Sequence, residues 1–112
     1  MNYEVVISKK AKSDISKIYS HILHKFKSTI NANSVLNKIY SELEDLSFMA
    51  GSYHLYPNEP WHSKGMHYYS VKNYSIFYDV TENIDKTDYD GVVTVLHVIY
   101  GKRDLDAVLR NN

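Results

Sequence analysis

The side chains best suited to chemistry lie in the second half of the chain. The guanidinium of Arg103 can hold a phosphate or a carboxylate through paired hydrogen bonds. An imidazole titrates near neutral pH, so His67 is suited to moving a proton, and the ammonium of Lys64 can stabilise developing negative charge. Both main candidates also have a structural interpretation. Arg103 can pair with Asp104 or Asp106, and His67 can be a surface residue of a strand.

Tyrosine is the over-represented residue type in the same region. The chain has 11 tyrosines among 112 residues, and nine of them lie between Tyr40 and Tyr100. Tyrosine rings stack on nucleic-acid bases and fill protein interfaces. A strand-rich half of a protein also uses them as ordinary core residues, so both interpretations stay open at this point.

Several classes of site are excluded by the residues present. The chain has no cysteine, which excludes disulfides and thiolate metal sites. It has no nucleotide-binding glycine loop, serine-hydrolase elbow or zinc motif. His21 and His24 are three residues apart in a helical pattern, but no third ligand accompanies them. We therefore expect neither a metal nor a cofactor.

The composition is that of a globular protein, with 44% hydrophobic and 23% charged residues. No apolar run approaches the roughly 18 residues needed to span a bilayer. The segment from Met1 to Ile7 lacks the basic region and long apolar stretch of a signal peptide. We therefore expect a cytoplasmic protein without a membrane partner, folded as a single domain over residues 1–112.

The formal net charge is zero, but the charge is unevenly distributed. Residues 1–38 carry seven lysines against Glu4 and Asp14, an excess of +5. Residues 39–61 carry four acidic and no basic side chains, and residues 82–91 have a net charge of −3. Proteins that grip nucleic acid through phosphates usually carry a basic excess. The neutral total therefore argues against extensive phosphate binding.

The first half of the chain predicts a strand followed by a helical hairpin. Residues 2–7 are rich in Val, Ile and Tyr, as strands are. Ser8 is a good N-cap for a helix from Lys9 to about Lys27, and its lysines lie mostly off the apolar stripe. Ser28 or Thr29 begins a second helix, which ends near Gly51. A short connection between two amphipathic helices makes them antiparallel neighbours.

The second half predicts a packed loop and three strands. The loop of residues 51–63 contains two prolines but also large aromatic side chains, which indicates that it packs down. Strands follow at 67–72, 74–81 and 92–100, and the last is apolar on both faces, as a central strand is. Residues 104–109 add a helical turn. The expected fold is α+β, in the order β-α-α-β-β-β, with the helix pair on one face of a mostly antiparallel four-stranded sheet whose other face is partly open.

Three local patterns in this order resemble the RelE/ParE superfamily of bacterial toxins. The first is an apolar strand that leads through Ser8 into a helix with Ala11, Asp14 and Ile18. The second resembles the Gly-x-Arg and Tyr-x-Ile-x-Tyr strands of the family. It consists of Trp61-His62-Ser63-Lys64-Gly65-Met66-His67 followed by Val71-Lys72-Asn73-Tyr74-Ser75-Ile76-Phe77-Tyr78. The third is Val95-Leu96-His97-Val98-Ile99-Tyr100-Gly101-Lys102-Arg103-Asp104-Leu105, which is similar to the family's terminal strand and its [His/Tyr]-Gly-x-Arg-Asp-Leu ending.

The resemblance implies a toxin that inhibits bacterial growth, supports plasmid stabilisation and is neutralised by a cognate antitoxin protein. Members that resemble RelE cleave mRNA in the ribosome, and members that resemble ParE poison DNA gyrase. For a nuclease, the resemblance implies catalytic roles for four residues: His67, Arg103, Lys64 and Tyr100. For target binding it implies Lys72, Lys102, Arg103 and Tyr78.

Departures from the nuclease pattern favour a ParE-like gyrase poison. Many RelE-like enzymes have a Tyr or His about six residues after the terminal-strand arginine, where this chain has Leu109. The C-terminal His-Tyr pair of another nuclease branch is also missing, and the net charge is neutral although such nucleases are usually basic. The alternatives are a ribosome-dependent mRNA endonuclease and an inactive toxin homologue that acts as a binding or corepressor partner.

Overall fold

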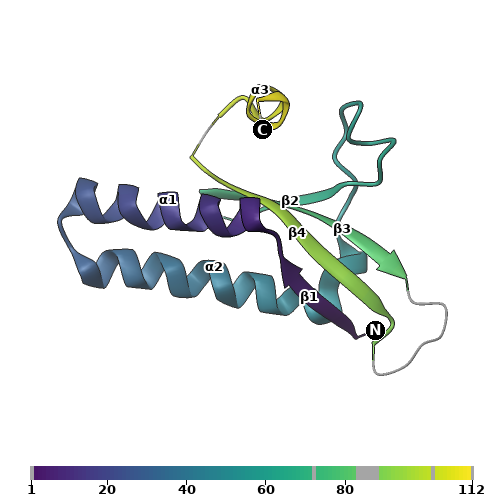
Figure 1. The fold of residues 1–112 in the computed structure, drawn as a ribbon, viewed down its shortest axis with the longest axis horizontal. Coiled ribbons are helices and arrows are strands. Elements are labelled where there is room, and N and C mark those ends of the chain that lie inside the picture. Colours follow the sequence, from purple (N-terminus) through teal and green to yellow (C-terminus); the bar gives the residue numbers. More distant parts are fainter. Residues whose placement is uncertain (1, 72, 83–88, 102, 112) are drawn as a thin grey trace.

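The fold has the predicted order of elements, with two long helices and a four-stranded sheet (Figure 1). A computed structural model describes residues 2–71, 73–82, 89–101 and 103–111. The elements are β1 (Tyr3–Ile7), α1 (Lys9–Phe26), α2 (Thr29–Met49), η1 (Ala50–Ser52), β2 (His67–Val71), β3 (Tyr74–Glu82), β4 (Gly91–Tyr100) and α3 (Leu105–Arg110). The α+β class is therefore confirmed.

The sheet joins the two ends of the chain. Its strand order is β1-β4-β3-β2, so β4 is an inner strand with a neighbour on each side. β1 runs parallel to β4, from Tyr3 opposite Gly91 to Ile7 opposite Val95. The other two pairings are antiparallel. The mostly antiparallel sheet predicted from the sequence is confirmed, and β4 is the buried central strand that its apolar pattern indicated.

Serine side chains begin both long helices. The hydroxyl of Ser8 accepts a hydrogen bond from the N–H of Ala11 at 3.0 Å, and the hydroxyl of Ser28 accepts one from Asn31 at 3.2 Å. These bonds satisfy N–H groups that have no partner within the helix. Lys27, with a positive φ of 50°, ends α1 and turns the chain into α2. The helical hairpin predicted for this half is confirmed.

The helix pair buries its apolar stripes against one face of the sheet. α1 contributes four fully buried side chains, Ala11, Ile15, Ile18 and Ile22. α2 contributes Ala32, Ile39, Leu43 and Leu46. They pack with the sheet residues that point the same way, among them Val93, Val95 and Val98 of β4. This layer is the main core of the protein.

β4 contains a bulge that the sequence pattern does not reveal. Phe77 lies opposite His97, but the next residue of β3, Tyr78, lies opposite Val95. Leu96 is therefore an extra residue in β4. A bulge of this kind changes which side chains face each side of a sheet. Val95 and Val98 consequently both face the helices, although they are three residues apart.

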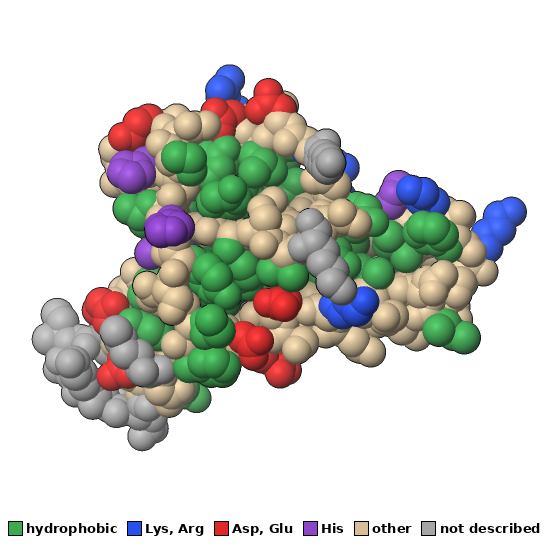
Figure 2. All heavy atoms as spheres, turned by 180° about the vertical axis from the view of Figure 1, so that it is seen from behind, with side chains coloured by type: hydrophobic (Ala, Val, Ile, Leu, Met, Phe, Trp, Pro, Cys, Tyr) green, Lys and Arg blue, Asp and Glu red, His purple; other side chains and the backbone are tan. Residues whose placement is uncertain are grey.

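The other face of the sheet carries a second, smaller core. It is built by Tyr56 and Met66 of the loop before β2, Phe77 of β3, Ile99 of β4 and Leu109 of α3. The backbone N–H of Tyr56 donates to the carbonyl of Met66 at 2.7 Å, which holds the loop together. Figure 2 shows apolar side chains gathered in the upper half of the molecule, where α3 and this loop lie in Figure 1. The loop is packed down, as its aromatic content predicted.

We expect Tyr78→Phe to lower stability. The Tyr78 side chain is fully buried, and its hydroxyl donates to the carbonyl of Ala50, where α2 ends. Loss of one buried hydrogen bond costs about 1 kcal/mol, and about 1–3 kcal/mol if the acceptor stays unsatisfied. Urea unfolding followed by circular dichroism measures this difference.

Tyr40→Phe is the matched control, because the Tyr40 side chain lies on the exposed side of α2 and is 39% accessible. Its free energy of unfolding should stay within about 0.5 kcal/mol of the unmodified protein. Equal stability of both variants would contradict a structural role for the Tyr78 hydroxyl.

Candidate functional site

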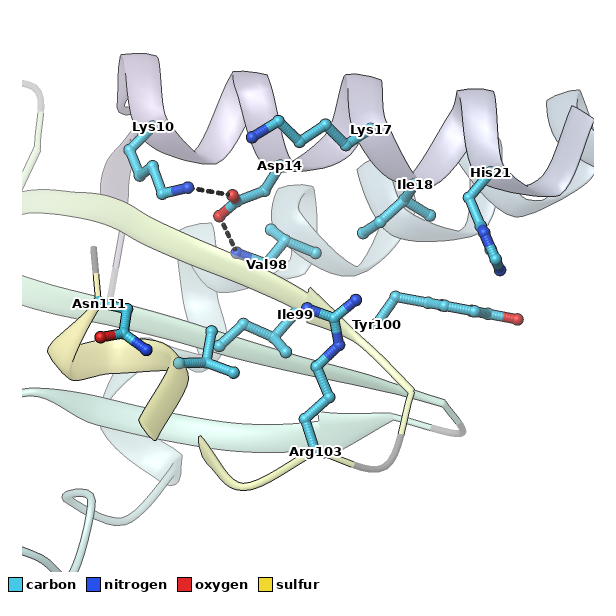
Figure 3. Close-up of a pocket in the computed structure, with 11 residues that line it drawn as sticks. Lys10, Asp14, Lys17, Ile18, His21, Val98, Ile99, Tyr100, Arg103 and Asn111 are labelled. Carbon is cyan, nitrogen blue, oxygen red and sulfur yellow. Dashed lines mark hydrogen bonds and ion pairs between the residues drawn. The ribbon is translucent and has the colours of Figure 1, made fainter. Parts of the chain in front are cut away.

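A groove of about 420 Å³ opens between α1, the end of β4 and the segment that leads into α3 (Figure 3). One wall is α1, the floor is β4, and the other wall contains Arg103. The lining residues are Lys10, Asp14, Lys17, Ile18 and His21 from α1, Val98, Ile99 and Tyr100 from β4, and Arg103, Val108 and Asn111 from the C-terminal segment.

The groove exists because β1 is shorter than β4. β1 ends at Ile7, so the second half of β4 has no strand on that side, and the start of α1 takes the place of one. The N–H of Ser8 donates to the carbonyl of Val95 at 3.0 Å, and the Ser8 hydroxyl donates to the carbonyl of Leu96 at 3.3 Å. α1 is thereby anchored beside the exposed edge of β4.

Asp14, six residues after Ser8, also takes the place of a neighbouring strand. One carboxylate oxygen, Oδ2, accepts a hydrogen bond from the N–H of Val98 at 3.1 Å. The other, Oδ1, lies 2.9 Å from the ammonium nitrogen of Lys10. Asp14 therefore satisfies a backbone N–H of β4 that no strand reaches, and its own charge is balanced by Lys10.

The remaining charge of the groove is positive. Lys10, Lys17 and Arg103 give +3 and Asp14 gives −1, so the lining has a net charge of +2 with His21 neutral. Figure 3 shows Arg103 extending towards α1 across the end of β4, with Lys17 on the helix opposite. Apolar side chains of β4, α1 and α3 lie between these cations. The groove thus suits a ligand that combines a negative charge with an apolar part.

Arg103 makes no ion pair with any residue that the structure describes. The acidic neighbours expected for it have other partners. Asp104 caps α3 by accepting from the N–H of Ala107 at 3.2 Å. Asp106 accepts hydrogen bonds from the Tyr56 hydroxyl and from Asn58 at 2.9 Å. The exposed guanidinium of Arg103 is therefore available to a ligand.

The hydrogen bonds to Asp106 also set its charge. The Tyr56 hydroxyl and the Asn58 amide lower the pKa of the Asp106 carboxyl below its ordinary value, and Arg110 adds a smaller effect in the same direction. Asp106 therefore stays ionised while it ties α3 to the loop before β2. This contact fixes α3, and α3 follows Arg103 directly.

The four residues predicted to act in a nuclease fall into two groups. Tyr100 and Arg103 line the same groove. His67 is level with Tyr78 and Val95 in the sheet, whereas Arg103 comes after Tyr100 at the end of β4. On β3, which has no extra residue, Tyr78 is four residues from Tyr74, the partner of Tyr100, which corresponds to about 13 Å. The structure brings Tyr100 and Arg103 together and leaves His67 on the edge strand β2, level with the middle of β3 and β4.

His67 and Lys64 have surroundings of their own. The Nδ1 atom of His67 lies 3.0 Å from the carbonyl oxygen of Tyr53, and its ring stacks on Tyr78 with the centroids 5.0 Å apart. These contacts fix the loop to β2. The His67 side chain is half-buried, so part of it also faces solvent. Lys64 is exposed on the loop before β2.

The prediction that Tyr78 contacts a target is wrong for this structure. Its side chain is fully buried in the main core, with the hydroxyl bonded to Ala50. A target cannot reach it without unfolding the sheet. Lys72 and Lys102, the other two predicted contacts, lie outside the described residues.

Sequence reasoning missed the contribution of α1 to the groove. Its lysines have the pattern of a solvated helix face, yet Lys10 and Lys17 lie across the groove from Arg103.

His97 was also missed. It is the one ionisable residue in the apolar run from Val92 to Ile99, and its largely buried Nδ1 atom has no hydrogen-bond partner among the described residues. A single ionisable residue in such a run was the available signal.

Comparison with known families matches most of the chain. Residues 5–105 match the model of the ParE toxin of the type II toxin–antitoxin system parDE. The protein belongs to the ParE toxin family. No curated protein matches its sequence.

Two solved structures share the fold of this ParE family member. One is the chromosomal ParDE toxin–antitoxin system from P. aeruginosa, with a TM-score of 0.69 and 16% sequence identity over 89% of this chain and 97% of that chain. The other is the toxin–antitoxin complex RelBE2 from Mycobacterium tuberculosis, with a TM-score of 0.61 and 16% identity over 89% of this chain and 99% of that chain. Because both ParE-type and RelE-type systems are similar to it, the fold alone does not select a target.

None of the helices in the described part of the chain has the length and apolarity that crossing a membrane requires. Over the same residues, no three or more His, Cys, Asp or Glu side chains are arranged to hold a metal ion.

We expect acid to destabilise this ParE family member through His97. Burial lowers the pKa of His97 below its ordinary value, nearby Lys10 lowers it further, and Asp14 opposes part of the change. The unfolded chain therefore binds a proton before the folded one does. The free energy of unfolding should fall as the pH drops below about 6.5, the ordinary value for histidine. Urea unfolding at pH 7.5 and pH 5.5 measures the change.

His97→Gln should reduce this loss, because glutamine does not titrate. His24→Gln is the control, since His24 is exposed on α1 and should leave the pH dependence almost unchanged. A His97→Gln variant that loses as much stability between the two pH values as the unmodified protein would show that His97 is not responsible.

Proposed function

We propose that this protein is the toxin of a type II toxin–antitoxin pair, that it inhibits growth by poisoning DNA gyrase, and that a cognate antitoxin neutralises it. The family match over residues 5–105 supports the first part. The observation that supports a non-nuclease mechanism is that His67 does not line the groove that contains Arg103. We assign target binding to the guanidinium of Arg103, which makes no ion pair with a described residue, and to the groove around it.

RNA cleavage needs several groups at one phosphate. A base must take the 2′-OH proton, an acid must protonate the leaving oxygen, and a cation must stabilise the charge between them. Each proton-transfer group has to lie within hydrogen-bond reach of the same substrate. His67 lies about 13 Å along the sheet from the level of Tyr100, by strand length. Leu109, at the position of the late Tyr or His of many nucleases, is buried in the second core.

The chemistry of the groove fits a protein target. Its excess of two positive charges is enough for one carboxylate or one phosphate, but small for a nucleic-acid strand that presents a phosphate at every residue. The apolar side chains of Ile18 in the α1 wall and Ile99 in the floor lie next to the cations. A segment with an acidic side chain beside an apolar one satisfies both parts of this surface.

The antitoxin is proposed from the two similar structures. One is described as a ParDE toxin–antitoxin system and the other as a RelBE2 toxin–antitoxin complex. By analogy, a partner protein covers this chain and blocks access to its target.

One alternative is an inactive homologue, which would bind an antitoxin tightly without inhibiting growth.

A ribosome-dependent mRNA endonuclease is the second candidate, and one observation favours it. The groove contains potential proton-transfer groups beside Arg103. The rings of His21 and Tyr100 lie 6.0 Å apart, and both residues line the groove. A nuclease of this kind would use His21 rather than His67, a choice that the sequence did not indicate.

We expect expression of the chain alone in bacteria to stop growth, and co-expression of the antitoxin to restore it. Arg103→Ala should relieve the inhibition without lowering stability, since the side chain is exposed and unpaired within the described structure. A paired contact to a charged group is worth about 1.5–3 kcal/mol, or about ten- to a hundredfold in affinity. Colony counts after induction measure the effect.

Arg110→Ala is the matched control, because Arg110 is an exposed arginine of α3 that lies 3.9 Å from Asp106 and does not line the groove. It should remain toxic. If Arg103→Ala is as toxic as the unmodified chain, the groove is not the target site. If the unmodified chain allows normal growth, the protein is not an active toxin.

We expect purified toxin to convert relaxed plasmid into gyrase-dependent cleaved DNA. In bacteria that express the toxin, primer extension on ribosome-bound mRNA should show no new 5′ ends at early times. The reverse result, with codon-linked cuts and normal gyrase supercoiling, would replace the proposed mechanism with the nuclease. His21→Ala then becomes the deciding variant, with His67→Ala as its control.

A further inference from the structure

The outward face of α2 differs from an ordinary solvated helix face. Ile30, Ser34, Asn37, Ser41 and Phe48 follow one another at helical spacing, on the side opposite the buried stripe of the same helix. All five are exposed, with accessible fractions of 80% for Ile30 and 61% for Phe48. We call this stripe the α2 face.

Large apolar side chains are concentrated on the exposed side of α2. Of the six exposed large hydrophobic residues among those described, three belong to this helix: Ile30, Tyr40 and Phe48. Figure 1 shows α2 along the lower side of the molecule, away from α3. The face is apolar at both ends and has small polar side chains between them, flanked by Lys38, Glu44 and Asp45. A helix face with exposed large apolar side chains is better suited to another protein surface than to water.

The middle of the face is hollowed because its side chains are small. A shallow groove there is lined by Ile30, Asn33, Ser34, Asn37, Lys38 and Ser41. Phe48 projects from the same face two turns beyond Ser41. Between Ile30 and Ser41 the α2 face therefore has a shallow groove lined mostly by polar side chains, and near its other end Phe48 presents a large apolar side chain.

We propose that the α2 face pairs with the α2 face of a second copy of this chain, with the two helices antiparallel about a twofold axis at Ser41. Residues equally far before and after Ser41 then lie level with each other. Ser34 and Phe48 are both seven residues away, about 10 Å along the helix. The Phe48 side chain of each copy fills the hollow beside Ser34 of the other, so the contact is self-complementary, as a twofold interface requires.

The charges on the face select this arrangement. Lys38 lies three residues before Ser41, and Glu44 and Asp45 lie three and four residues after it. An antiparallel pair places Lys38 of each copy level with the two carboxylates of the other, once on each side of the axis. A parallel pair would place Lys38 against Lys38. Because these carboxylates repel phosphate groups, the α2 face is unsuitable for binding the backbone of a nucleic acid.

The dimer leaves the candidate target site free. No residue of α2 lines the groove around Arg103. The contact involves little more than one helix from each copy, which is at the small end of specific interfaces. We therefore expect a dimer that forms at micromolar concentration and presents two target grooves. Its existence does not depend on the target of the toxin.

The test uses sedimentation velocity of the purified full-length chain across a micromolar concentration series. The unmodified chain should sediment as a dimer at high concentration. Lys38→Glu should weaken dimerisation at least tenfold, because each interface then contains only acidic groups. The double variant Glu44→Lys/Asp45→Lys should weaken it similarly, because each interface then contains only lysines. Circular dichroism verifies that each variant is folded.

The deciding sample is an equimolar mixture of these two variants. In a mixed dimer, the new glutamate of one chain meets the new lysines of the other, and the original Lys38 meets the original carboxylates. The mixture should recover the dimer that neither variant forms alone. Phe48→Ser should weaken dimerisation, and Phe26→Ser is its control, because Phe26 is 51% exposed at the end of α1 and lies off the α2 face.

Three results would overturn the proposal. The unmodified chain could remain a monomer at the highest concentration, or the mixture could fail to associate. The variants could also leave self-association unchanged but weaken capture of the antitoxin, which would assign the α2 face to that partner. None of these results bears on growth inhibition, so the proposed toxin function is tested separately.

Discussion

The hydrogen bond from the Val98 N–H to the Asp14 carboxylate is the contact on which the arrangement of the site depends. β1 covers only the first half of β4, so the second half would otherwise present an open edge. An open strand edge attracts other chains, and a buried N–H without a partner is costly. Asp14 prevents both, and Ser8, six residues earlier, makes further hydrogen bonds to the same edge of β4. These contacts hold α1 beside β4, which fixes the two sides of the groove relative to each other.

The elements of the fold were largely predictable because their causes are local. Ser8 and Ser28 begin helices by bonding N–H groups three residues later, and buried side chains recur along each helix at regular spacing. The bulge at Leu96 was not predictable. Apolar residues occupy both parities of β4, so moving the register by one residue leaves the hydrophobic pattern unchanged.

The site was less predictable, because its residues depend on contacts between distant parts of the chain. Arg103 is exposed because Asp104 and Asp106 are engaged elsewhere, and one of their partners, Tyr56, lies 50 residues from Asp106. Tyr78 is buried because its hydroxyl finds the carbonyl of Ala50, 28 residues away. A tyrosine on a strand can face a ligand or a core equally well in sequence terms, and only packing decides between the two.

The net charge of the chain did not predict the electrostatic field in the groove around Arg103. The chain is neutral overall, yet the fold places the basic first helix opposite Arg103 and keeps the acidic end of α2 away from that groove. Fields at short range depend on which charges face one another, because screening removes most interactions beyond about 8–10 Å. A neutral protein can therefore bind a single anionic group firmly while lacking the extended positive surface that a nucleic-acid strand requires. This distinction is the physical reason for preferring a protein target.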